Sequence, residues 1–515
     1  MKEIKRALIS VYYKDGLEEI VKILAENNVE ILSTGGTYSF LENMGIPVKS
    51  VESVTGYPSI LGGRVKTLHP KVFGGILNRR EHAQDAQEIQ QYEIPSIDLV
   101  IVDLYPFEEY VAANASHEDI IEKIDIGGIS LIRGAAKNYN DVVIIPSKDS
   151  YGTLLSILKE RGCKTTLEER EYFAAQAFNV SSHYDTAIFN YFNRKFEIPA
   201  FKQSQQKAQT LRYGENPHQK GTYYGAEGTL PKQLHGKEIS HNNLLDIEAA
   251  VELISDFTDT TVAIIKHNNA CGCASAATTL EAWEKALAGD PVSAFGGIIV
   301  TNREVDKATA EEMNKIFFEV VIAPSYNAEA LEILKSKKNR IILESNNVTP
   351  TPVKFRSLLG GVLVQDRDAH VETPEELKPV TEKQPRAEEI EDLIFANKLV
   401  KHTKSNAIVL AKGKQLLASG TGQTSRVDAL RQAIQKAKSF GFSLEGAVMS
   451  SDAFFPFADC VEIAAKEGIK TVRRLLVCSM LFLNRNNLML MLLCWRLNTC
   501  SPRRWKIRLL RCCIK

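Results

Sequence analysis

The sequence has no net charge and no excess of either apolar or polar residues. Its 515 residues include 63 Lys and Arg against 63 Asp and Glu, so a protein that binds nucleic acid through bulk charge is not expected. With 44% hydrophobic and 24% charged residues and a mean hydropathy of −0.15, the chain matches neither a disordered nor a membrane-spanning protein. Its length predicts roughly two to four globular domains.

The sequence also lacks a signal peptide and a cysteine framework. No basic segment followed by an apolar core begins at Met1, so we expect a cytoplasmic protein. Four of the nine cysteines are scattered through residues 1–472 without the spacing of a disulfide scaffold, which does not favour structural disulfides. They are Cys163, Cys271, Cys273 and Cys460.

The last 43 residues differ from the rest in composition. Residues 473–515 contain eight Arg, two Lys and five Cys but no Asp, Glu or Gly, which leaves 53 basic against 63 acidic residues, a net charge of −10, in residues 1–472. A shifted reading frame produces an abrupt change of this kind, and we interpret the tail in that way. Residues 484–487 (NRNN) interrupt its apolar part, which argues against a membrane span. A tail that binds nucleic acid is the alternative, and it predicts salt-dependent DNA binding.

Alternating β-rich runs and helical periodicity predict an α/β fold for the first half. We expect strands at residues 7–11, 29–33, 99–104 and 142–145. The first helix should bury Leu17, Ile20, Val21 and Leu24, with Asp15 as its N-cap because Glu18 follows three residues later. Strands that alternate with helices predict a parallel sheet covered by helices.

A second α/β region follows a polar stretch at residues 202–209, so we place a domain boundary near residue 200. Its expected strands are residues 262–265, 298–300, 320–323 and 407–410. Residues 366–389 are rich in charge and proline and read as an exposed linker, with similar α/β units on its two sides.

Several segments of the first half suit an anionic ligand. Residues 33–37 (STGGT) follow a strand and precede a helical pattern, where backbone amides can hold a phosphate. Residues 62–70 (GGRVKTLHP) combine glycines, cations and a hydroxyl in one loop. Three further segments add a phenol, carboxylates and cations near strand ends, and they are residues 103–107, 125–128 and 133–138. Each segment alone would equally suit an ordinary turn or surface loop.

The second half contains two segments of the same kind. Residues 212–219 (RYGENPHQ) place a guanidinium and a phenol in a tight turn, and residues 266–273 (KHNNACGC) follow an apolar run. His267, Cys271 and Cys273 invite a zinc interpretation, which we disfavour because C-x-C is an unusual spacing and no second ligand pair stands nearby. Thr278 and Glu281 predict a capped helix.

Taken in order, these segments resemble a known family, the bifunctional proteins that join AICAR formyltransferase to IMP cyclohydrolase. The cyclohydrolase half is matched by Lys14 and by residues 35–37, 63–70, 104–107 and 125–128. The formyltransferase half is matched by residues 212–219, 266–269, 290–296, 405–406, 422–426 and 451–459. Departures are Tyr12 and Tyr13 where many members have Ser-Asp, Asp103 where many have Asn, and the whole sequence after Val472.

The resemblance implies a fold and two reactions. Residues 1–199 would form a methylglyoxal-synthase-like parallel sheet domain and residues 200–472 paired cytidine-deaminase-like α/β units without zinc. The second domain would transfer a formyl group from 10-formyltetrahydrofolate to AICAR, and the first would close formyl-AICAR to IMP with loss of water. No metal is required, and the family associates as homodimers. The alternative is a nucleotide-binding protein whose formyltransferase activity is lost through the altered C-terminus.

The resemblance also implies site residues. For ring closure the catalytic residues would be Lys66, Tyr105, Asp125 and Lys137. The nucleotide would be held by Ser10, Lys14, Thr34, Gly36, Thr37, Arg64 and Thr67. For formyl transfer His267 would be the base, assisted by Lys266 and Asn406. AICAR and folate would be bound by Arg212, Tyr213, Asn243, Phe295, Gln423, Arg426 and Asp459.

Overall fold

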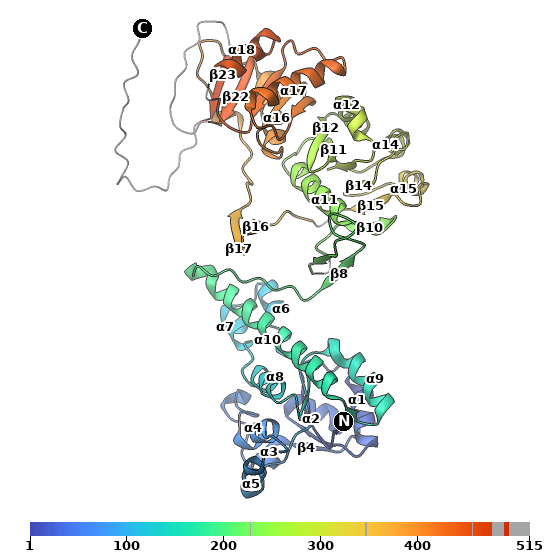
Figure 1. The fold of residues 1–515 in the computed structure, drawn as a ribbon, viewed down its shortest axis with the longest axis vertical. Helices are drawn as coiled ribbons and strands as arrows, with labels where there is room; N and C mark the ends of the chain where they lie inside the picture. Colours follow the sequence, from blue (N-terminus) through green and yellow to red (C-terminus); the bar gives the residue numbers. More distant parts are fainter. Residues whose placement is uncertain (227, 346–347, 456, 476–488, 494–515) are drawn as a thin grey trace, which may run out of the picture. The chain divides into compact units, whose positions relative to one another are not determined.

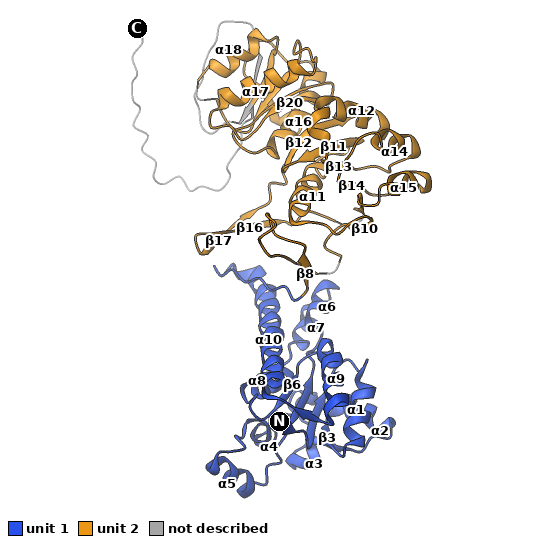
Figure 2. Ribbon diagram, turned by 45° about the vertical axis from the view of Figure 1, so that its right-hand side comes forward, with its two compact units in different colours: residues 1–206 blue, residues 207–515 orange. Residues whose placement is uncertain are grey.

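The computed structural model describes residues 1–226, 228–345, 348–455, 457–475 and 489–493 (Figure 1). The chain forms two compact units, Met1–Gln206 and Lys207–Lys515, and the division falls within the polar stretch at residues 202–209 (Figure 2). Among the described helices, none is long and apolar enough to cross a membrane.

The first unit is a five-stranded parallel sheet with helices on it. The sheet order is β4-β3-β2-β5-β6, and every neighbouring pair is parallel. The strands of the unit are β1 (Lys2–Glu3), β2 (Arg6–Ser10), β3 (Glu30–Ser33), β4 (Val48–Ser50), β5 (Leu99–Val102), β6 (Val143–Ile145) and β7 (Lys164–Thr165). The helices are α1 (Leu17–Glu26), α2 (Gly35–Asn43), α3 (Val51–Thr55), η1 (Leu61–Gly63), α4 (Pro70–Leu77), α5 (Ala83–Gln91), α6 (Phe107–Ala112), α7 (His117–Glu122), α8 (Gly127–Lys137), η2 (Lys148–Ser150), α9 (Tyr151–Arg161) and α10 (Leu167–Phe196).

The four predicted strands of this unit are confirmed as β2, β3, β5 and β6, and their apolar side chains form the core. Helix α1 buries the predicted face of Leu17, Ile20, Val21 and Leu24. The predicted cap of this helix is wrong, because Gly16, with φ of 79°, is the N-cap and no side chain caps the end. A left-handed turn at glycine therefore starts the helix, and the Asp15 side chain is not used.

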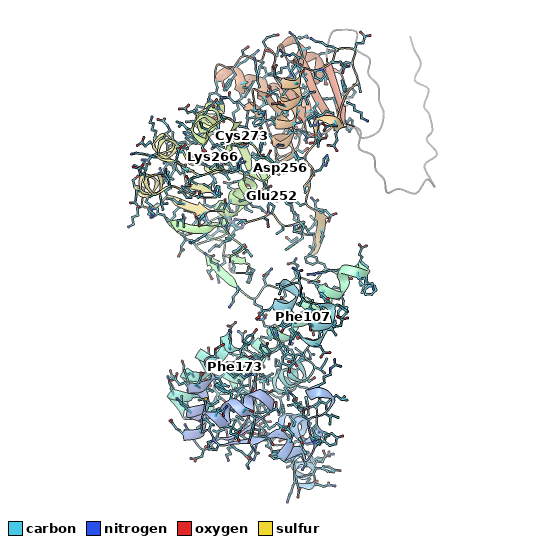
Figure 3. All side chains as sticks on the ribbon, turned by 180° about the vertical axis from the view of Figure 1, so that it is seen from behind. Phe107, Phe173, Glu252, Asp256, Lys266 and Cys273 are labelled. Atoms are coloured by element: carbon cyan, nitrogen blue, oxygen red, sulfur yellow. The ribbon has the colours of Figure 1, made fainter. Side chains whose placement is uncertain are left out.

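Helix α10 stabilises the first unit along its length. It begins with a capping box between Thr166 and Glu169 and buries Phe173 against the sheet. Phe173 and Phe107 are among the largest fully buried side chains and are labelled in Figure 3. Farther along α10, Tyr184 packs on Phe107 with ring centroids 6.1 Å apart. The helix therefore joins the sheet core to the smaller cluster around α6 and α7.

The second unit contains a twelve-stranded mixed sheet in the order β10-β15-β14-β13-β11-β12-β20-β19-β21-β22-β23-β18. Its strands, with two separate hairpins, are β8 (Ala208–Leu211), β9 (Gly221–Tyr224), β10 (Lys232–His235), β11 (Thr261–Lys266), β12 (Asn269–Ser275), β13 (Ile298–Thr301), β14 (Val320–Ala323), β15 (Ile341–Glu344), β16 (Val353–Leu358), β17 (Gly361–Asp366), β18 (Leu377–Pro379), β19 (Ile408–Lys412), β20 (Gln415–Gly420), β21 (Val448–Ser451), β22 (Thr471–Leu475) and β23 (Met489–Leu493). The helices are α11 (His241–Ile254), α12 (Thr279–Gly289), α13 (Pro291–Ala294), α14 (Lys307–Met313), α15 (Ala328–Lys335), η3 (Pro374–Glu376), α16 (Ala387–Lys401), α17 (Arg426–Ser439) and α18 (Asp459–Lys466).

This sheet is built from two copies of one arrangement. Read from its two ends, the strand order is the same, with β10, β15, β14, β13, β11 and β12 equivalent to β18, β23, β22, β21, β19 and β20. Each copy contains an antiparallel hairpin (β11–β12 or β19–β20) with a β-bulge at the third residue of its second strand. The copies meet where β12 pairs with β20. The expected pair of α/β units is therefore present, although the copies share one continuous sheet.

The prediction that residues 366–389 form an exposed linker is wrong in part. Strand β18 lies in it and forms the edge of the sheet, with Leu377 buried. Glu372 is also buried, pairs with Arg473 at 2.5 Å and accepts a hydrogen bond from Asn397. A buried charge needs such partners, and this pair fastens the segment to β22. Of the tail, residues 473–475 extend β22 and residues 489–493 form β23, while the other tail residues lie outside the described ones.

We predict that Gly420→Ala destabilises the second unit strongly. A Cβ atom at Gly420 would lie 1.8 Å from the carbonyl oxygen of Ala429 in α17, so β20 and α17 would have to separate. The expected loss is about 3 kcal/mol or more, measured as the free energy of unfolding in urea. Gly361→Ala is the control, because its Cβ would meet nothing closer than 3.5 Å. An unchanged midpoint in Gly420→Ala would contradict this packing.

Candidate active sites

A cavity of about 680 Å³ lies in the first unit at the carboxyl ends of β2, β3 and β5. These strands are parallel, so the residues at their carboxyl ends, Ser10 as the last of β2 and Thr34 and Asp103 directly after β3 and β5, meet at one edge of the sheet. The chain continues from β2 toward β3 on one side, while β5 lies on the other, and doubly wound sheets place their ligand crevice at such a switch point. The position of this cavity therefore follows from the order and direction of the strands and does not depend on the side chains that line it.

The walls of the cavity suit an anion. The N-terminal residues of α2, Gly35 to Thr37, and of α8, Gly127 and Gly128, both line it, and helix N-termini attract negative charge. Lys14, Arg64 and Lys66 add positive charge. A Cβ atom on Gly35 would lie 3.5 Å from the Lys66 ammonium, which shows how closely Lys66 approaches the start of α2.

Long-range hydrogen bonds fix the loops around this cavity. The Asp103 carboxylate accepts the backbone N–H of Tyr12 and, at 2.9 Å, that of Tyr13, so it ties the loop after β2 to β5. Thr37 exchanges hydrogen bonds with the backbone of Val11, at 3.1 Å from the amide and 2.9 Å to the carbonyl. Burial raises the pKa of Asp103, an effect that the two amides oppose. The loop is therefore held from both sides.

Asp125 and Tyr105 face the cavity from the other side. The Asp125 carboxylate accepts the Gly128 N–H at 2.5 Å, and its own N–H donates at 2.9 Å to the hydroxyl of Tyr184 from α10. Burial raises the pKa of Asp125, and burial together with the charge of Asp125 raises that of Tyr105. A carboxyl group with a raised pKa is a better proton acceptor than an ordinary carboxylate, and the phenol beside it can donate a hydrogen bond.

The predicted residues of the first half meet in this cavity with one exception. Its lining includes Ser10, Lys14, Thr34, Gly36, Thr37, Arg64, Lys66, Thr67, Tyr105 and Asp125. Lys137 does not line it and is exposed in the last turn of α8. Since the cavity meets the first turn of this helix, ten residues place Lys137 about 15 Å away along the axis. Lys137 therefore does not line this cavity, and its role in ring closure stays a prediction.

Two lining residues had no signal in the sequence. Tyr12 packs edge-on against Tyr105 with ring centroids 5.7 Å apart, and Lys123 enters from the end of α7. Tyr12 appeared only as a departure from the family pattern, and Lys123 lies in a helical segment without any motif. Tertiary folding alone brings both of them to Tyr105.

The second site is organised by the tight turn between β11 and β12. Lys266 pairs with Asn269, so His267 and Asn268 are the two central residues, with φ of 50° and 64°. Two successive positive φ values define a type I′ turn, in which Asn and Gly are usual, and a positive φ is uncommon for residues other than Gly. The turn leaves His267 exposed beyond the end of the sheet, and Lys266 and His267 line a cavity of about 440 Å³.

Helix α11 holds this turn. The Asp246 carboxylate accepts the Asn268 N–H at 2.6 Å, and one helical turn earlier Asn242 donates to the Glu215 carbonyl at 3.3 Å. Residues four apart lie on the same helix face, so α11 connects the segment 212–219 to the His267 turn. Within that segment Arg212 donates to the Tyr213 hydroxyl at 2.8 Å.

The other copy contains the same framework with different side chains. Its turn is Gly413–Lys414, with φ of 58° and 53°, and Asp392 of α16 accepts both N–H groups at 2.8 and 2.7 Å. Lys266 donates to the carbonyl of Phe295, and Lys412 donates at 2.7 Å to that of Glu445. The framework is therefore repeated, whereas the imidazole occurs only in the first copy.

A polar cluster lies beside the turn, near the start of β19 and the end of β21 in the second copy. The Arg426 guanidinium donates to Asn406 Oδ1 at 3.0 Å, to Asp452 at 2.9 Å and to Ser451 at 2.9 Å. Burial opposes ionisation of Asp452, but hydrogen bonds from Ser405 and Arg426 keep its pKa below the ordinary value. This cluster adjoins the His267 turn, because Asn269 Oδ1 accepts the N–H of Lys404 at 3.0 Å.

The structure thus brings together part of the predicted set. Lys266, His267 and Phe295 meet at the turn, and Asn406, Gln423 and Arg426 meet in the adjoining cluster. The Asn243 side chain belongs instead to the capping box of α11, where it bonds to Ser240. Asp459 begins α18 and accepts the N–H of Cys460 at 2.7 Å.

Zinc binding by His267, Cys271 and Cys273 does not fit this geometry. The bulge in β12 turns Cys271 toward the core cluster that contains Trp283, while Cys273 lies in the cluster on the opposite face of the sheet. Figure 3 labels Cys273 and Lys266 on this hairpin. Burial raises the pKa of Cys271 to about 12, so the thiolate that a metal needs is disfavoured.

The fold and these sites define an enzyme with two α/β units, each with its own cavity at the ends of strands. Residues 135–436 match the model of the AICARFT/IMPCHase bienzyme family, and residues 16–130 match that of the MGS-like domain. The chain therefore belongs to the AICARFT/IMPCHase bienzyme family and is an enzyme of purine biosynthesis. The methylglyoxal-synthase-like assignment of the first domain is confirmed, while the cytidine-deaminase likeness stays a prediction.

Relatives of this chain are similar over most of its length. The bifunctional purine biosynthesis protein PurH of Bacteroides thetaiotaomicron is 66% identical over 471 residues, which cover 92% of this chain and 93% of that protein. The proteins of the same name from Aquifex aeolicus and Acetivibrio thermocellus are 48% and 47% identical, each over 91% of this chain and 93% of their own. A solved structure described as the crystal structure of ForH covers 36% of this chain and 96% of its own, at 34% identity and a TM-score of 0.33.

We predict that Asp246→Ala slows formyl transfer because it releases the Asn268 N–H and lets the His267 turn move. Misplacement of a reacting group typically lowers kcat by roughly tenfold to a hundredfold, and we expect a loss of that size with little change in the KM for AICAR. Asp246→Asn keeps one acceptor oxygen and should restore most of the rate. Steady-state kinetics of formyl transfer measures these effects.

The second copy supplies a matched control. Asp392→Ala removes the same kind of contact from the Gly413–Lys414 turn, so it should lower thermal stability while the folded enzyme keeps its kcat. Equal kcat losses in Asp246→Ala and Asp392→Ala would show that the Asp246 contact serves stability only.

Proposed function

We propose that the second unit transfers a formyl group from 10-formyltetrahydrofolate to AICAR and that the first unit closes formyl-AICAR to IMP. The observation that carries this proposal is the separation of proton-transfer groups, with His267 on a turn of the second unit and Asp125 in a cavity of the first. Neither step needs a metal in this scheme. From the family resemblance we further propose a cytoplasmic homodimer.

For formyl transfer, we assign the base to His267. The 5-amino group of AICAR is conjugated with the ring carboxamide and is a weak nucleophile, so it must lose a proton as it attacks the formyl carbon. A neutral imidazole accepts that proton near pH 7. The Lys266 ammonium, which precedes it in the turn, would stabilise the oxygen of the tetrahedral centre or return a proton to the folate nitrogen. Asn406, fixed by Arg426 and by the Gln423 carbonyl at 2.9 Å, would orient the imidazole or the formyl oxygen.

Substrate binding in the second unit would use the groups around the turn. Arg212 and Tyr213 would contact AICAR, with Phe295 and Arg426 on its other sides. Gln423, Asn243 and Asp459 complete the assignment from the resemblance. Support is stronger for the first four, since Asn243 and Asp459 are engaged in local helix-end contacts.

For ring closure, we assign binding of the nucleotide phosphate to the two helix N-termini together with Lys14, Arg64 and Thr67. Both reacting ends belong to one molecule, so holding them together supplies much of the rate. Lys66 and Tyr105 would stabilise charge on the formyl oxygen, and Asp125 would take the proton of the carboxamide nitrogen as it attacks the formyl carbon. The formyl oxygen receives this proton from Asp125 and a second proton from the formamido nitrogen, its bond to the formyl carbon breaks, and it leaves as water while the C=N bond of the new ring forms.

The test of the two-site assignment is His267→Ala. Removal of a general base should lower formyl transfer by roughly 10²- to 10⁴-fold and leave the cyclisation of supplied formyl-AICAR at its full rate. Lys66→Ala should do the opposite. Each half-reaction is assayed separately by absorbance. If either variant abolished both activities while staying folded, separate sites would be wrong. Tight binding of AICAR and IMP by the unaltered chain without turnover would favour the nucleotide-binding alternative.

Cyclisation should be lost in acid because Asp125 acts as a carboxylate. Burial raises its pKa above that of an ordinary aspartate, so the base is protonated, and the rate falls, as the pH drops through that raised pKa. The acid limb of the pH profile of kcat for cyclisation measures this loss. Asp103 also has a raised pKa, so Asp103→Asn is the comparison variant: the limb should persist in it. An acid limb that disappears in Asp103→Asn would assign the titration to Asp103 instead.

A further inference from the structure

Two adjacent tyrosines in the loop after β2 have no part in the reactions assigned above. Tyr12 lines the cavity of the first unit and is 40% exposed, and Tyr13 follows it in the chain. Neither ring belongs to the hydrophobic core clusters that the described residues of this unit form. Packing of the core therefore does not explain these two rings, whereas their contacts with the cavity wall do.

The Asp103 carboxylate fixes the backbone of this loop. It accepts the N–H of Tyr12 with one oxygen and, at 2.9 Å, the N–H of Tyr13 with the other. A carboxylate suits this bridge because both of its oxygens are acceptors, whereas an amide side chain has one acceptor oxygen. Asp103 also stands two residues before Tyr105, so the loop and the phenol assigned to ring closure are attached to the same short segment after β5.

The Tyr12 ring packs on the ring of Tyr105. The two centroids are 5.7 Å apart and the ring planes are inclined by 71°, which is the edge-to-face arrangement that aromatic rings favour. Tyr105 is itself 40% exposed, and its hydroxyl forms no hydrogen bond with another described residue. The orientation of this phenol therefore depends on packing, and Tyr12 is the aromatic ring that packs on it.

Tyr13 holds the helix that follows Tyr105. Its hydroxyl donates to the carboxylate of Glu109, which lies in the first turn of α6, and α6 begins two residues after Tyr105. Burial and this hydrogen bond raise the pKa of Tyr13, so the hydroxyl stays protonated and keeps donating across the neutral range. The Lys148 ammonium, at the start of η2, also lies 5.0 Å from the centroid of the Tyr13 ring. The ring thus connects α6 with η2.

The placement of Tyr105 matters because its hydroxyl would stabilise charge on the formyl oxygen. A hydrogen-bond donor stabilises a developing oxyanion only when it is aimed at the position that the oxygen takes in the transition state. A shift of about 1 Å in a reacting group can cost roughly a hundredfold in rate. Contacts that restrain the segment from Asp103 to Glu109 therefore influence the rate of ring closure without touching the nucleotide.

Tyr12, Tyr13 and Asp103 are also the positions at which the first unit departs from the family pattern. That pattern, Ser-Asp in the loop and Asn after β5, has one carboxylate among the three positions, and so has this chain, where Asp103 carries it. A further carboxylate in place of the Tyr13 side chain would stand beside those of Asp103 and Glu109, which would repel it. The contacts of the three residues thus account for their differing from the pattern as a set.

We propose that Tyr12 and Tyr13 are positioning residues for ring closure, which hold Tyr105 through its own ring and through the helix that follows it. This inference rests on the ring closure proposed for the first unit. Tyr12 acts directly on the Tyr105 ring, and Tyr13 acts through Glu109 and α6. Both tyrosines belong to the loop that Asp103 anchors, so the three residues work as one unit.

The first test is Tyr12→Ala in the full chain, assayed for cyclisation of supplied formyl-AICAR. We expect kcat to fall by roughly threefold to tenfold, the effect of one lost edge-to-face pair, with an unchanged KM and unchanged formyl transfer. Tyr12→Phe keeps the ring and should restore the rate. Tyr172→Ala is the matched control, because Tyr172 is also exposed and packs edge-on against Phe173 at 5.4 Å, but lies on α10 outside the cavity lining. An equal fall of kcat in the control, or a rise in KM alone in Tyr12→Ala, would overturn the proposal.

A double-mutant cycle with Tyr105→Phe tests whether Tyr12 acts through Tyr105. Once the Tyr105 hydroxyl is removed, the position of its ring no longer affects the formyl oxygen, so Tyr12→Ala should have little further effect. An equal loss in both backgrounds would overturn the proposal.

NMR of protein with labelled tyrosine rings gives a readout that needs no turnover. Tyr12→Ala should shift the ring signals of Tyr105, and unmoved signals would overturn the proposal. If the signals move but Tyr105→Phe closes the ring at the full rate, Tyr12 does position Tyr105, and only the reaction step assigned to Tyr105 is refuted.

Tyr13 is tested by moving the carboxylate. Tyr13→Asp removes the hydrogen bond to Glu109 and adds a carboxylate beside two others, so it should lower kcat for cyclisation by roughly tenfold. Addition of Asp103→Asn removes one of these charges and supplies an amide N–H for the new carboxylate, so the double variant should recover part of the rate. Losses that multiply in the double variant would show that the positions are independent and would overturn the proposal.

Discussion

Burial of the strands on both faces is the constraint on which the sites of this enzyme depend. Strands such as β5, β13 and β14 are buried along their whole length, so a polar side chain within them would need a partner in the core. Reactive groups therefore lie where strands end, and the parallel or antiparallel pairing decides which ends meet. In the first unit parallel strands bring Ser10, Thr34 and Asp103 together, and in the second an antiparallel hairpin extends His267 past the edge.

Comparison of the two copies in the second unit distinguishes features of the shared fold, which both copies keep, from side chains that occur in one copy only. Both copies keep the bulged hairpin, the turn with two positive φ values, and an aspartate, Asp246 or Asp392, that accepts a backbone N–H of the turn. The copies differ where His267 is replaced by Gly413. Glycine adopts a positive φ without strain, whereas a histidine there costs conformational energy, and such a cost is retained where a side chain is needed. The comparison within one chain thus points to the imidazole without recourse to other sequences.

Local pattern was sufficient for much of this fold. Apolar runs located the buried strands, because a strand of four or five buried residues has few alternatives, and glycine-rich turns after strands located the cavity. Local pattern did not predict the features that depend on contacts between residues far apart in the sequence. The hydrogen bonds from Tyr12 and Tyr13 to Asp103 span about ninety residues of sequence, and no pattern in either segment predicts them. Residues 366–389 look solvated by composition, yet Arg473, a hundred residues away, makes Glu372 a buried group.

Helix length and strand irregularity account for the remaining differences between the predictions from sequence and the structure. A short motif such as residues 133–138 looks close to residues 125–128 in sequence, but the helix that joins them carries Lys137 away from the cavity. The C-x-C spacing looks like a pair of ligands on one face only if the strand is regular, and the bulge in β12 places the two thiols on opposite faces. The same bulge in β20 keeps both hairpins in matching register, so it belongs to the scaffold. The geometry that separates the two thiols is thus a property of the duplicated fold.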